Sequence, residues 1–150
     1  MKKVINKKSK FEYNILEKFE AGLVLTGPEV KSVKTGQINL KGSYVTIKHK
    51  PKTEVFLINA HISKYKPAGL QPDYDPTRSR KLLLHRKEIN KLIGKMKEKG
   101  LTIVPLSVYT KHNRIKLEFG IGRGKKKFEK KDTIKKRETK RKIERAMKQY

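Results

Sequence analysis

Residues 101–121 read LTIVPLSVYTKHNRIKLEFGI and carry the clearest structural signal in the chain. In residues 114–121, apolar side chains alternate with Lys116, Glu118 and Gly120, which is the period of a half-buried β-strand. Residues 101–110 are apolar for most of their length, and Lys111-His112-Asn113 forms a polar turn between the two segments. The stretch therefore predicts two long strands joined as an antiparallel pair.

Upstream of this pair, four shorter segments have the pattern of β-strands. They are residues 11–15, 23–25, 43–48 and 55–62. Turn signals such as Gly27-Pro28 separate them, and the last two segments are close enough in sequence to form a hairpin.

Residues 85–99 are the one clear helix outside the C-terminal tail, because apolar residues recur there at helical spacing and Gly100 follows. Residues 29–35 predict one or two further helical turns, and residues 63–80 a long polar loop. We predict a mainly β protein with helices (α+β). Its body is expected to be a closed antiparallel β-barrel of the oligonucleotide-binding (OB) type, with about six strands and one main helix packed on it.

The composition indicates a polyanionic partner. The 150 residues include 40 Lys and Arg but only 14 Asp and Glu, which gives a formal net charge of +26. The chain has no cysteine, no apolar run of the roughly 20 residues that a membrane span needs, and no pattern of a signal peptide at its start. We therefore expect a cytoplasmic protein that binds nucleic acid and does not enter membranes.

The positive charge divides the chain into two parts. Residues 1–122 hold 26 Lys and Arg against 10 Asp and Glu, whereas residues 123–150 hold 14 against 4. The second segment has few apolar residues, so it cannot bury enough surface to order itself alone. We predict a body, residues 1–122, and a basic tail, residues 123–150, that is disordered when free and helical against a polyanion.

Catalytic patterns are missing from the sequence. The four histidines are scattered, the carboxylates are sparse, and the glycines of residues 120–124 follow a strand without opening a phosphate-binding helix. We expect neither an enzyme nor a bound cofactor or metal.

Three features suggest how a nucleic acid would be bound. Arg78, Arg80 and Lys81 end the long loop and could contact phosphate, although a solvated loop explains them as well. The apolar triplet at residues 82–84 cannot face one core entirely, so one side chain could stack on an unpaired base. Glu20 could accept hydrogen bonds from a base or ribose, or could simply form a salt bridge or cap.

Longer strings in the sequence resemble those of the small protein B family, SmpB. They include FEAGLVLTGPEVKS at residues 19–32, GSY at 42–44, AHISKY at 60–65, DPTRSRKLLL at 75–84 and GRGKK at 122–126. These strings occur in the order and spacing of that family from about residue 6 to residue 131.

The resemblance implies a non-enzymatic bacterial protein with an OB-type barrel that binds transfer-messenger RNA (tmRNA, the SsrA RNA). It implies delivery of this RNA to the A site of ribosomes stalled on messages without a stop codon, followed by peptide tagging and ribosome rescue. The body would replace the missing anticodon arm, and the tail would reach the decoding centre of the small subunit and the empty mRNA channel. Elongation factor Tu would be a further partner through the shared RNA, and DNA would not be one. A basic structural ribosomal protein is the alternative that charge and fold leave open.

The resemblance also assigns residues. Asn6, Glu20 and Leu83 match positions that bind the tRNA-like domain of the RNA, and the neighbouring cations Lys7, Lys8, Arg78, Arg80 and Lys81 would contact phosphates. The ribosome-binding part of the tail would comprise Lys125, Lys126, Lys127, Phe128, Glu129, Lys130, Lys131, Lys135, Lys136 and Arg137.

The tail departs from the family pattern at one string. Glu129-Lys130-Lys131 stands where the family has Asp-Lys-Arg, so Lys131 lacks the bidentate fork of arginine. Phe128 precedes this string, and we expect it to stack on a ribosomal RNA base.

Overall fold

The computed structural model of the chain describes residues 1–148, without the side chains of residues 127 and 128. In this part of the chain there are four α-helices, and their bounds are α1 Lys7–Glu12, α2 Gly27–Lys34, α3 Arg86–Lys95 and α4 Lys127–Lys148. A short 3-10 turn, Lys66–Ala68, lies in the long loop. None of these helices is both long and apolar enough to cross a membrane.

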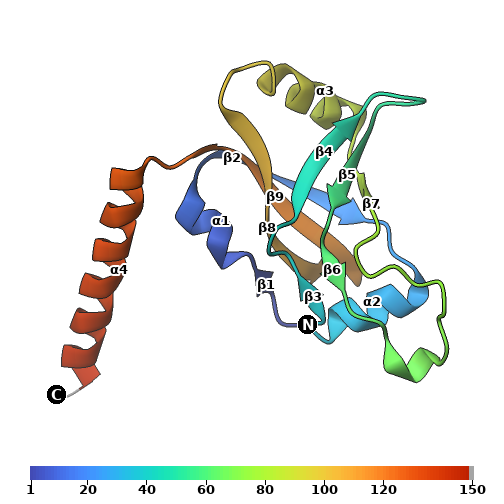
Figure 1. Cartoon of the computed structure of the whole chain (residues 1–150), viewed down its shortest axis with the longest axis horizontal. Helices are drawn as coiled ribbons and strands as arrows, with labels where there is room; N and C mark the ends of the chain where they lie inside the picture. The colour runs from blue at the N-terminus through green and yellow to red at the C-terminus, as the bar shows by residue number, and fades with distance from the viewer. Residues whose placement is uncertain (149–150) are drawn as a thin grey trace.

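The strands form one large sheet and one small one (Figure 1). The seven-stranded sheet has the order β1-β8-β9-β2-β7-β5-β4, and all of its pairings are antiparallel. Its strands are β1 Val4–Ile5, β2 Tyr13–Leu23, β4 Tyr44–Lys48, β5 Glu54–Ile58, β7 Arg80–Leu83, β8 Leu101–Lys111 and β9 Arg114–Gly124. The second sheet pairs β3 Ile38–Asn39 with β6 His61–Ile62.

The sequence-based prediction of a mainly antiparallel sheet with helices is confirmed, but the closed barrel is wrong. In the described residues the large sheet ends at β1 on one side and at β4 on the other, without a ladder that joins them. The edge of β8 is already used, because Asn6 donates from its backbone to Leu106 O (2.8 Å) and from Nδ2 to Pro105 O (2.9 Å). Pro105 has no N–H to offer a closing strand. The sheet therefore curls but stays open.

The predicted pair of long strands is confirmed as β8 and β9, and both extend further than the alternation indicated. Gly120 and Gly122 do not follow the end of a strand, as expected for residues 120–124; they lie within β9. A Cβ at Gly120 would lie 2.7 Å from Ile15 Cγ2, and one at Gly122 would lie 2.7 Å from Asn14 O. These glycines let β2 pass close to β9 at the bulge between Ile15 and Glu17.

The core lies on the concave side of the large sheet, where Phe19 of β2 stacks on Phe119 of β9 with ring centroids 5.5 Å apart. Helix α3 contributes Ile89 and Leu92 to this core, and α2 contributes Val33. The predicted helix at residues 85–99 ends earlier than expected, at Lys95, and the helical turns at 29–35 are confirmed as α2. Helix α1 and the strands β1, β3 and β7 were not predicted. The predicted strand at residues 55–62 is divided into β5 and β6, and those at 11–15 and 23–25 are the two ends of one strand, β2, which begins only at Tyr13 and ends at Leu23.

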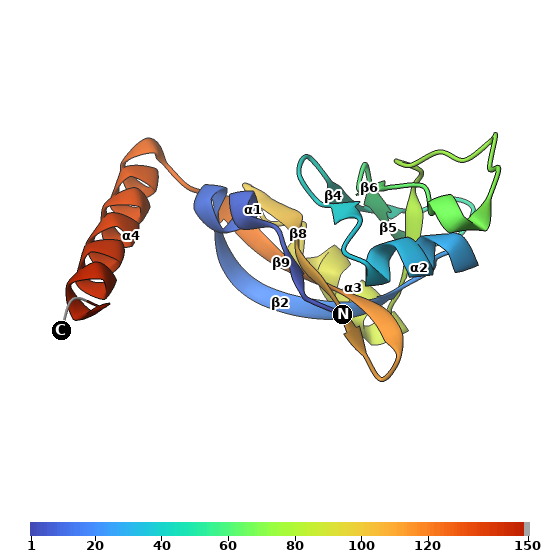
Figure 2. The ribbon, with the colours of Figure 1, turned by 90° about the horizontal axis from the view of Figure 1, so that it is seen from below.

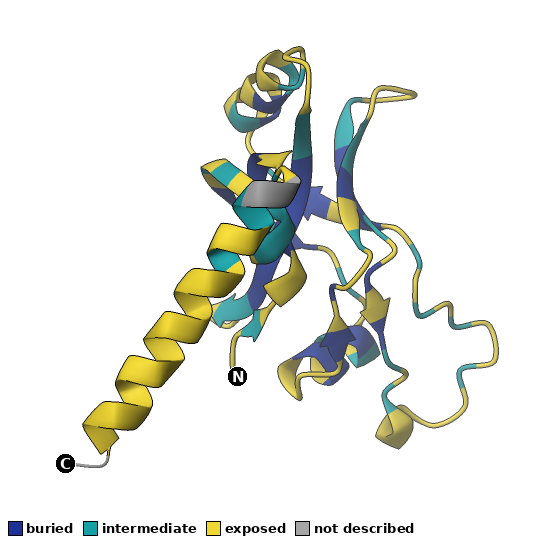
Figure 3. Cartoon of the chain, turned by 60° about the vertical axis from the view of Figure 1, so that its left-hand side comes forward, coloured by how far each residue is buried: buried dark blue, intermediate teal, exposed yellow. Residues whose placement is uncertain are grey.

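Helix α4 projects from the rest of the molecule (Figures 1 and 2), and most of its surface is exposed (Figure 3). It meets the body beside α1, where Lys125 N donates to Glu12 O (2.7 Å) and Asn14 Nδ2 donates to Glu129 Oε2 (2.9 Å). The Arg137 guanidinium lies 5.7 Å from the centroid of the Phe11 ring. These few contacts hold the first half of α4 against the body as far as Arg137, and residues 138–148 are exposed.

Candidate nucleic-acid interface

Glu20 lies on the face of β2 that is turned away from the core, next to β9 and β8. Its Oε2 accepts a hydrogen bond from the Tyr109 hydroxyl, and its Oε1 accepts one from Lys111 Nζ at 3.3 Å. The Tyr109 bond is the main cause of a lowered pKa at Glu20, Lys111 adds to it, and partial burial opposes it. The site therefore presents an oriented, ionised carboxylate at the surface of a basic protein.

Leu83 is close to this carboxylate, because Leu83 of β7 pairs with Gly22 of β2, two residues beyond Glu20. Its side chain is 55% exposed, whereas that of Leu82 is buried. Gly22 leaves room for it, since a Cβ there would lie 3.4 Å from Leu83 Cβ. The apolar triplet predicted to expose one side chain thus exposes chiefly Leu83.

A groove of about 590 Å³ runs along this face beside Leu83. Arg114 and Lys116 of β9 and His85 line it together with apolar side chains of β2 and α2. An apolar side chain among cations is suited to an unpaired base with its phosphates.

Asn6 lies apart from Glu20 and Leu83. It precedes α1 at the edge of β8, with β9 between β8 and β2. Lys7 and Lys8 follow it on α1 with exposed side chains, and Lys8 pairs with Glu12 at 3.7 Å. The structure therefore brings two of the three expected tRNA-domain residues together and places the third across the sheet.

Arg80 is the one predicted RNA contact that the structure does not leave at the surface. Its guanidinium is fully buried and donates to Glu29 Oε2 (2.9 Å from Nε), to Ala60 O (2.7 Å) and to Pro76 O (3.0 Å). A phosphate cannot reach it in this fold. The alternation of buried and exposed residues along β7 could have predicted this burial, because Arg80 is two residues before the buried Leu82 and so lies on the same face of the strand.

Glu29 is the anionic partner that makes this burial possible. It receives hydrogen bonds from Arg80, from Arg78 and from Thr26 N (3.0 Å), the residue that caps α2. Burial alone would raise the pKa of Glu29, but these bonds outweigh it and lower the pKa to about 2. The network ties the loop at residues 63–79 to α2.

The remaining cations of this region are more accessible. Arg78 pairs with Glu29 but exposes 35% of its side chain, and Lys81 is exposed and pairs with Glu54 at 3.0 Å. Both can therefore turn charge toward solvent, unlike Arg80.

The tail cations lie along α4 and just before it. Lys125 donates from Nζ to Thr133 Oγ1 at 2.9 Å, and Lys136 pairs with Asp132 at 3.6 Å. Lys126, Lys131 and Lys135 are exposed, and Lys130 is half-buried. The predictions for the Lys127 and Phe128 side chains lie outside the described part of the structure.

Sequence reasoning missed several residues that line the Glu20 face: Tyr109, Lys111, Arg114 and Lys116. Lys3 is another, with its ammonium 5.2 Å from the centroid of the Tyr109 ring. The parity of residues 114–121 could have identified Lys116, because this residue pairs with Gly22 and faces away from the core. Tyr109 had no such signal, since its role depends on pairing between distant strands.

Comparison with known proteins agrees with the resemblance. The family model described as SmpB protein matches residues 3–149. An SsrA-binding protein of Sulfurihydrogenibium sp. is 54% identical over 95% of this chain and 91% of its own length, and one of Gloeothece citriformis is 50% identical over 97% and 92%.

A solved structure supports the same assignment. A chain described as "tmRNA-SmpB: a journey to the center of the bacterial ribosome" superposes with a TM-score of 0.67 at 40% identity, over 83% of this chain and 85% of that chain. This structural likeness and the match of the family model over nearly the whole sequence point to the same family. The chain belongs to the SmpB family.

Proposed function

We propose that the protein is an SsrA-binding factor that binds tmRNA and takes part with it in trans-translation on stalled ribosomes. Relatives of the chain are named SsrA-binding proteins, and a structure that it resembles is described as tmRNA-SmpB in the bacterial ribosome. The observation in the fold that supports this function best is the Glu20 carboxylate, held by Tyr109 and Lys111 beside the exposed Leu83. This function is non-enzymatic and would place the protein in the cytoplasm.

The body carries the RNA contacts in this proposal. Glu20 accepts hydrogen bonds from bases or ribose, and Leu83 packs on an unpaired base of the tRNA-like domain. Asn6 contacts the same RNA from the edge of β8, which β9 separates from β2. Lys7, Lys8, Lys81 and the exposed edge of Arg78 contact phosphates, whereas Arg80 holds the loop that carries Arg78.

The tail carries the ribosome contacts. Helix α4 is long, strongly basic and mostly exposed. A segment that follows a channel lined by RNA needs these properties. It would reach the decoding centre and the empty mRNA channel while the body occupies the position of an anticodon arm. Elongation factor Tu would join through the shared RNA.

Removal of α4 tests this division. Because β9 continues to Gly124, past the predicted boundary at residue 122, the deletion should cover residues 127–150. The truncated protein should bind isolated tmRNA within about twofold of the full chain and should fail to support peptide tagging on stalled ribosomes. Equal loss of both activities would contradict the two-part design.

Glu20→Ala in the full chain tests the RNA site itself. The variant should bind the tRNA-like domain more weakly than Lys52→Gln, although Glu20→Ala makes the protein more positive and Lys52→Gln makes it less so. Tighter RNA binding by Glu20→Ala would show that Glu20 is only structural.

A further inference from the structure

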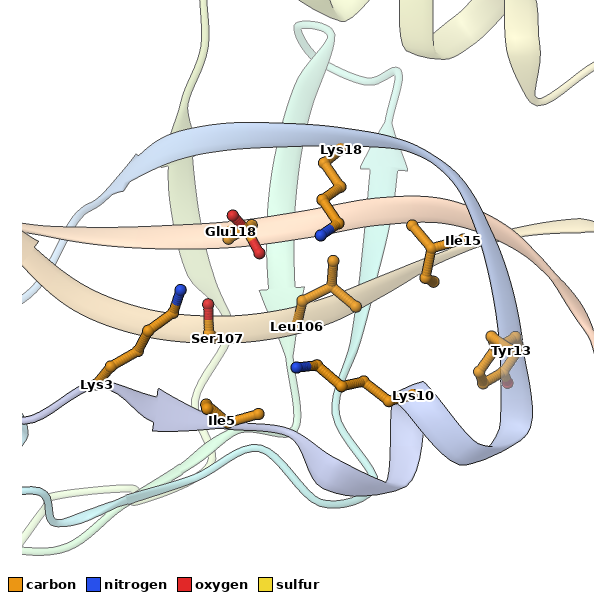
Figure 4. Close-up of a pocket in the computed structure, with 9 residues that line it drawn as sticks. All are labelled: Lys3, Ile5, Lys10, Tyr13, Ile15, Lys18, Leu106, Ser107 and Glu118. Atoms are coloured by element: carbon orange, nitrogen blue, oxygen red, sulfur yellow. The ribbon is translucent and has the colours of Figure 1, made fainter. Parts of the chain in front are cut away.

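A cavity of about 480 Å³ lies on the outer face of β8, β9 and β2, beneath α1 (Figure 4). Lysines from three separate elements surround it: Lys3 precedes β1, Lys10 is on α1, and Lys18 is on β2. Tyr13 closes one end of the cavity, and Leu106 lies at its floor. The cavity is separate from the groove beside Leu83, with which it shares no lining residue.

Two polar groups of this cavity lack partners within the described residues. Ser107 is only 2% exposed, and its Oγ makes no hydrogen bond there. The Glu118 carboxylate forms neither a hydrogen bond nor an ion pair with any side chain that the structure describes, although the protein is strongly basic. An unpaired buried hydroxyl costs about 1–3 kcal/mol, a cost that a ligand in contact with Ser107 Oγ would relieve.

The fold directs both groups into the cavity. Ser107 is opposite Glu118 in the β8–β9 ladder, so their side chains share a face of the sheet. The bulge between Pro105 and Ser107 lets the consecutive residues Leu106 and Ser107 both line the cavity, which a regular strand would not allow.

We infer that this cavity binds one unstacked guanine nucleotide of a single-stranded RNA segment. The inference rests on the RNA-binding function proposed above and adds a base-specific subsite to it. The ammonium groups of Lys3, Lys10 and Lys18 suit the flanking phosphates, and the Tyr13 ring offers a surface for stacking.

The choice of guanine follows from the Glu118 carboxylate, which only accepts hydrogen bonds. Guanine has two adjacent donors on its Watson–Crick edge, N1–H and the N2 amine, and these match the two carboxylate oxygens. Adenine and cytosine place an acceptor beside their donor, and uracil has one donor between two acceptors. The Ser107 hydroxyl is free to bond to a remaining polar atom of the base.

The test uses three RNA hairpins with the same stem and an otherwise uridine loop. One loop position carries guanosine, inosine or uridine, and inosine is guanosine without the N2 amine. Fluorescence anisotropy would measure the affinity of the full chain and of Glu118→Gln, Ser107→Ala, Lys18→Gln and the control Lys52→Gln, whose charge lies in the β4–β5 turn away from the cavity.

The wild-type chain should prefer the guanosine hairpin to the inosine hairpin by about tenfold, which is typical of one bidentate base contact. Glu118→Gln should abolish this preference, because its amide replaces one acceptor with a donor. Lys18→Gln should weaken binding to all three hairpins alike and by more than Lys52→Gln does, since a phosphate contact carries no base preference.

Ser107→Ala separates a ligand-binding role from a structural one. It should raise the free energy of unfolding, because it removes an unpaired hydroxyl, and should still weaken binding of the guanosine hairpin. Equal affinity of the wild-type chain for the three hairpins, or a guanine preference that survives Glu118→Gln, would overturn the inference. Intact binding of tmRNA in the same series would show that the proposed function stands when the subsite fails.

Discussion

Glu20 keeps its charge at the surface because Tyr109 and Lys111 hold its two carboxylate oxygens. These bonds come from β8, while Glu20 is on β2, so the carboxylate is oriented across two neighbouring strand pairs. An acceptor fixed in this way loses little conformational freedom when RNA donors reach it, which favours binding.

Tyr109→Phe should show how much this orientation contributes. Loss of the hydroxyl should raise the pKa of the Glu20 carboxyl toward that of an ordinary glutamate and weaken binding of the tRNA-like domain several-fold. NMR titration of the carboxyl and a filter-binding assay would measure the two effects. Tyr44→Phe removes an exposed hydroxyl on β4 and should change neither. An unchanged RNA affinity in Tyr109→Phe would mean that Glu20 binds without this support.

The Glu29 network predicts how stability depends on pH. Because the pKa of Glu29 is about 2 in the folded protein and about 4.5 otherwise, the ionised form stabilises the fold above pH 4.5. This contribution should disappear as the pH falls from 4.5 to about 2. Urea unfolding at a series of pH values would measure it.

Glu29→Gln should remove that acid-dependent loss and lower the free energy of unfolding at pH 7 by about 3 kcal/mol or more, because the buried Arg80 then lacks its anion. Glu98→Gln breaks an exposed pair with Arg123 and should change stability by less than about 1 kcal/mol. If Glu29→Gln lost the same amount of unfolding free energy in acid as the wild-type chain, the loss would come from another carboxylate.

At the scale of the elements, the close pairing of β2 with β9 at a bulge bends the large sheet. The bulge at Ile15 and Glu17 and the absence of a side chain at Gly120 act together there. Lys18 and Tyr13 of the same region line the cavity that is proposed to bind guanine, so the bend of β2 positions residues that are proposed to bind RNA.

Gly120→Ala should strain the pairing of β2 with β9. The new Cβ would lie 2.7 Å from Ile15 Cγ2 and 3.0 Å from Glu17 O, so β2 must move, at a cost of about 1–3 kcal/mol of unfolding free energy. Gly94→Ala in α3 meets nothing within 4 Å and should leave stability unchanged or raise it. Thermal unfolding of both variants makes the comparison, and equal stabilities would show that the sheet adjusts without strain.

At the scale of the whole molecule, the charge is placed on two separate surfaces. Helix α4, which holds much of the tail charge, projects away from the body (Figure 2), and cations of the sheet surround the face on which Glu20 and Glu118 are opposite each other. The two surfaces can therefore meet different polyanions at the same time.

This separation predicts two salt dependences. Deletion of residues 127–150 should make the salt dependence of ribosome binding clearly shallower, because fewer phosphate contacts release fewer counterions. The salt dependence of binding to isolated tRNA-like RNA should stay nearly the same. Titrations between 50 and 200 mM salt would measure both slopes. If the deletion changed the two slopes equally, α4 would contact tmRNA as well as the ribosome.

Much of the fold could be predicted from local patterns. The strict alternation after Arg114 indicated β9, the helical spacing of Ile89 and Leu92 indicated α3, and a turn signal followed by Glu29 indicated α2. Closure of the sheet could not be predicted, because it depends on what occupies the edge of β8. Asn6 occupies that edge from a segment 99 residues away.

The sequence by itself determined the antiparallel β architecture, the basic surface and the family, because periodicity, charge and motif strings are local properties of the chain. Only the tertiary structure decided that Arg80 is buried against Glu29, that Tyr109 holds Glu20, and that Ser107 and Glu118 meet three lysines at one cavity. Each of these contacts joins strands or helices that are distant in sequence. Their register and curvature, rather than residue type, therefore decide which side chains meet.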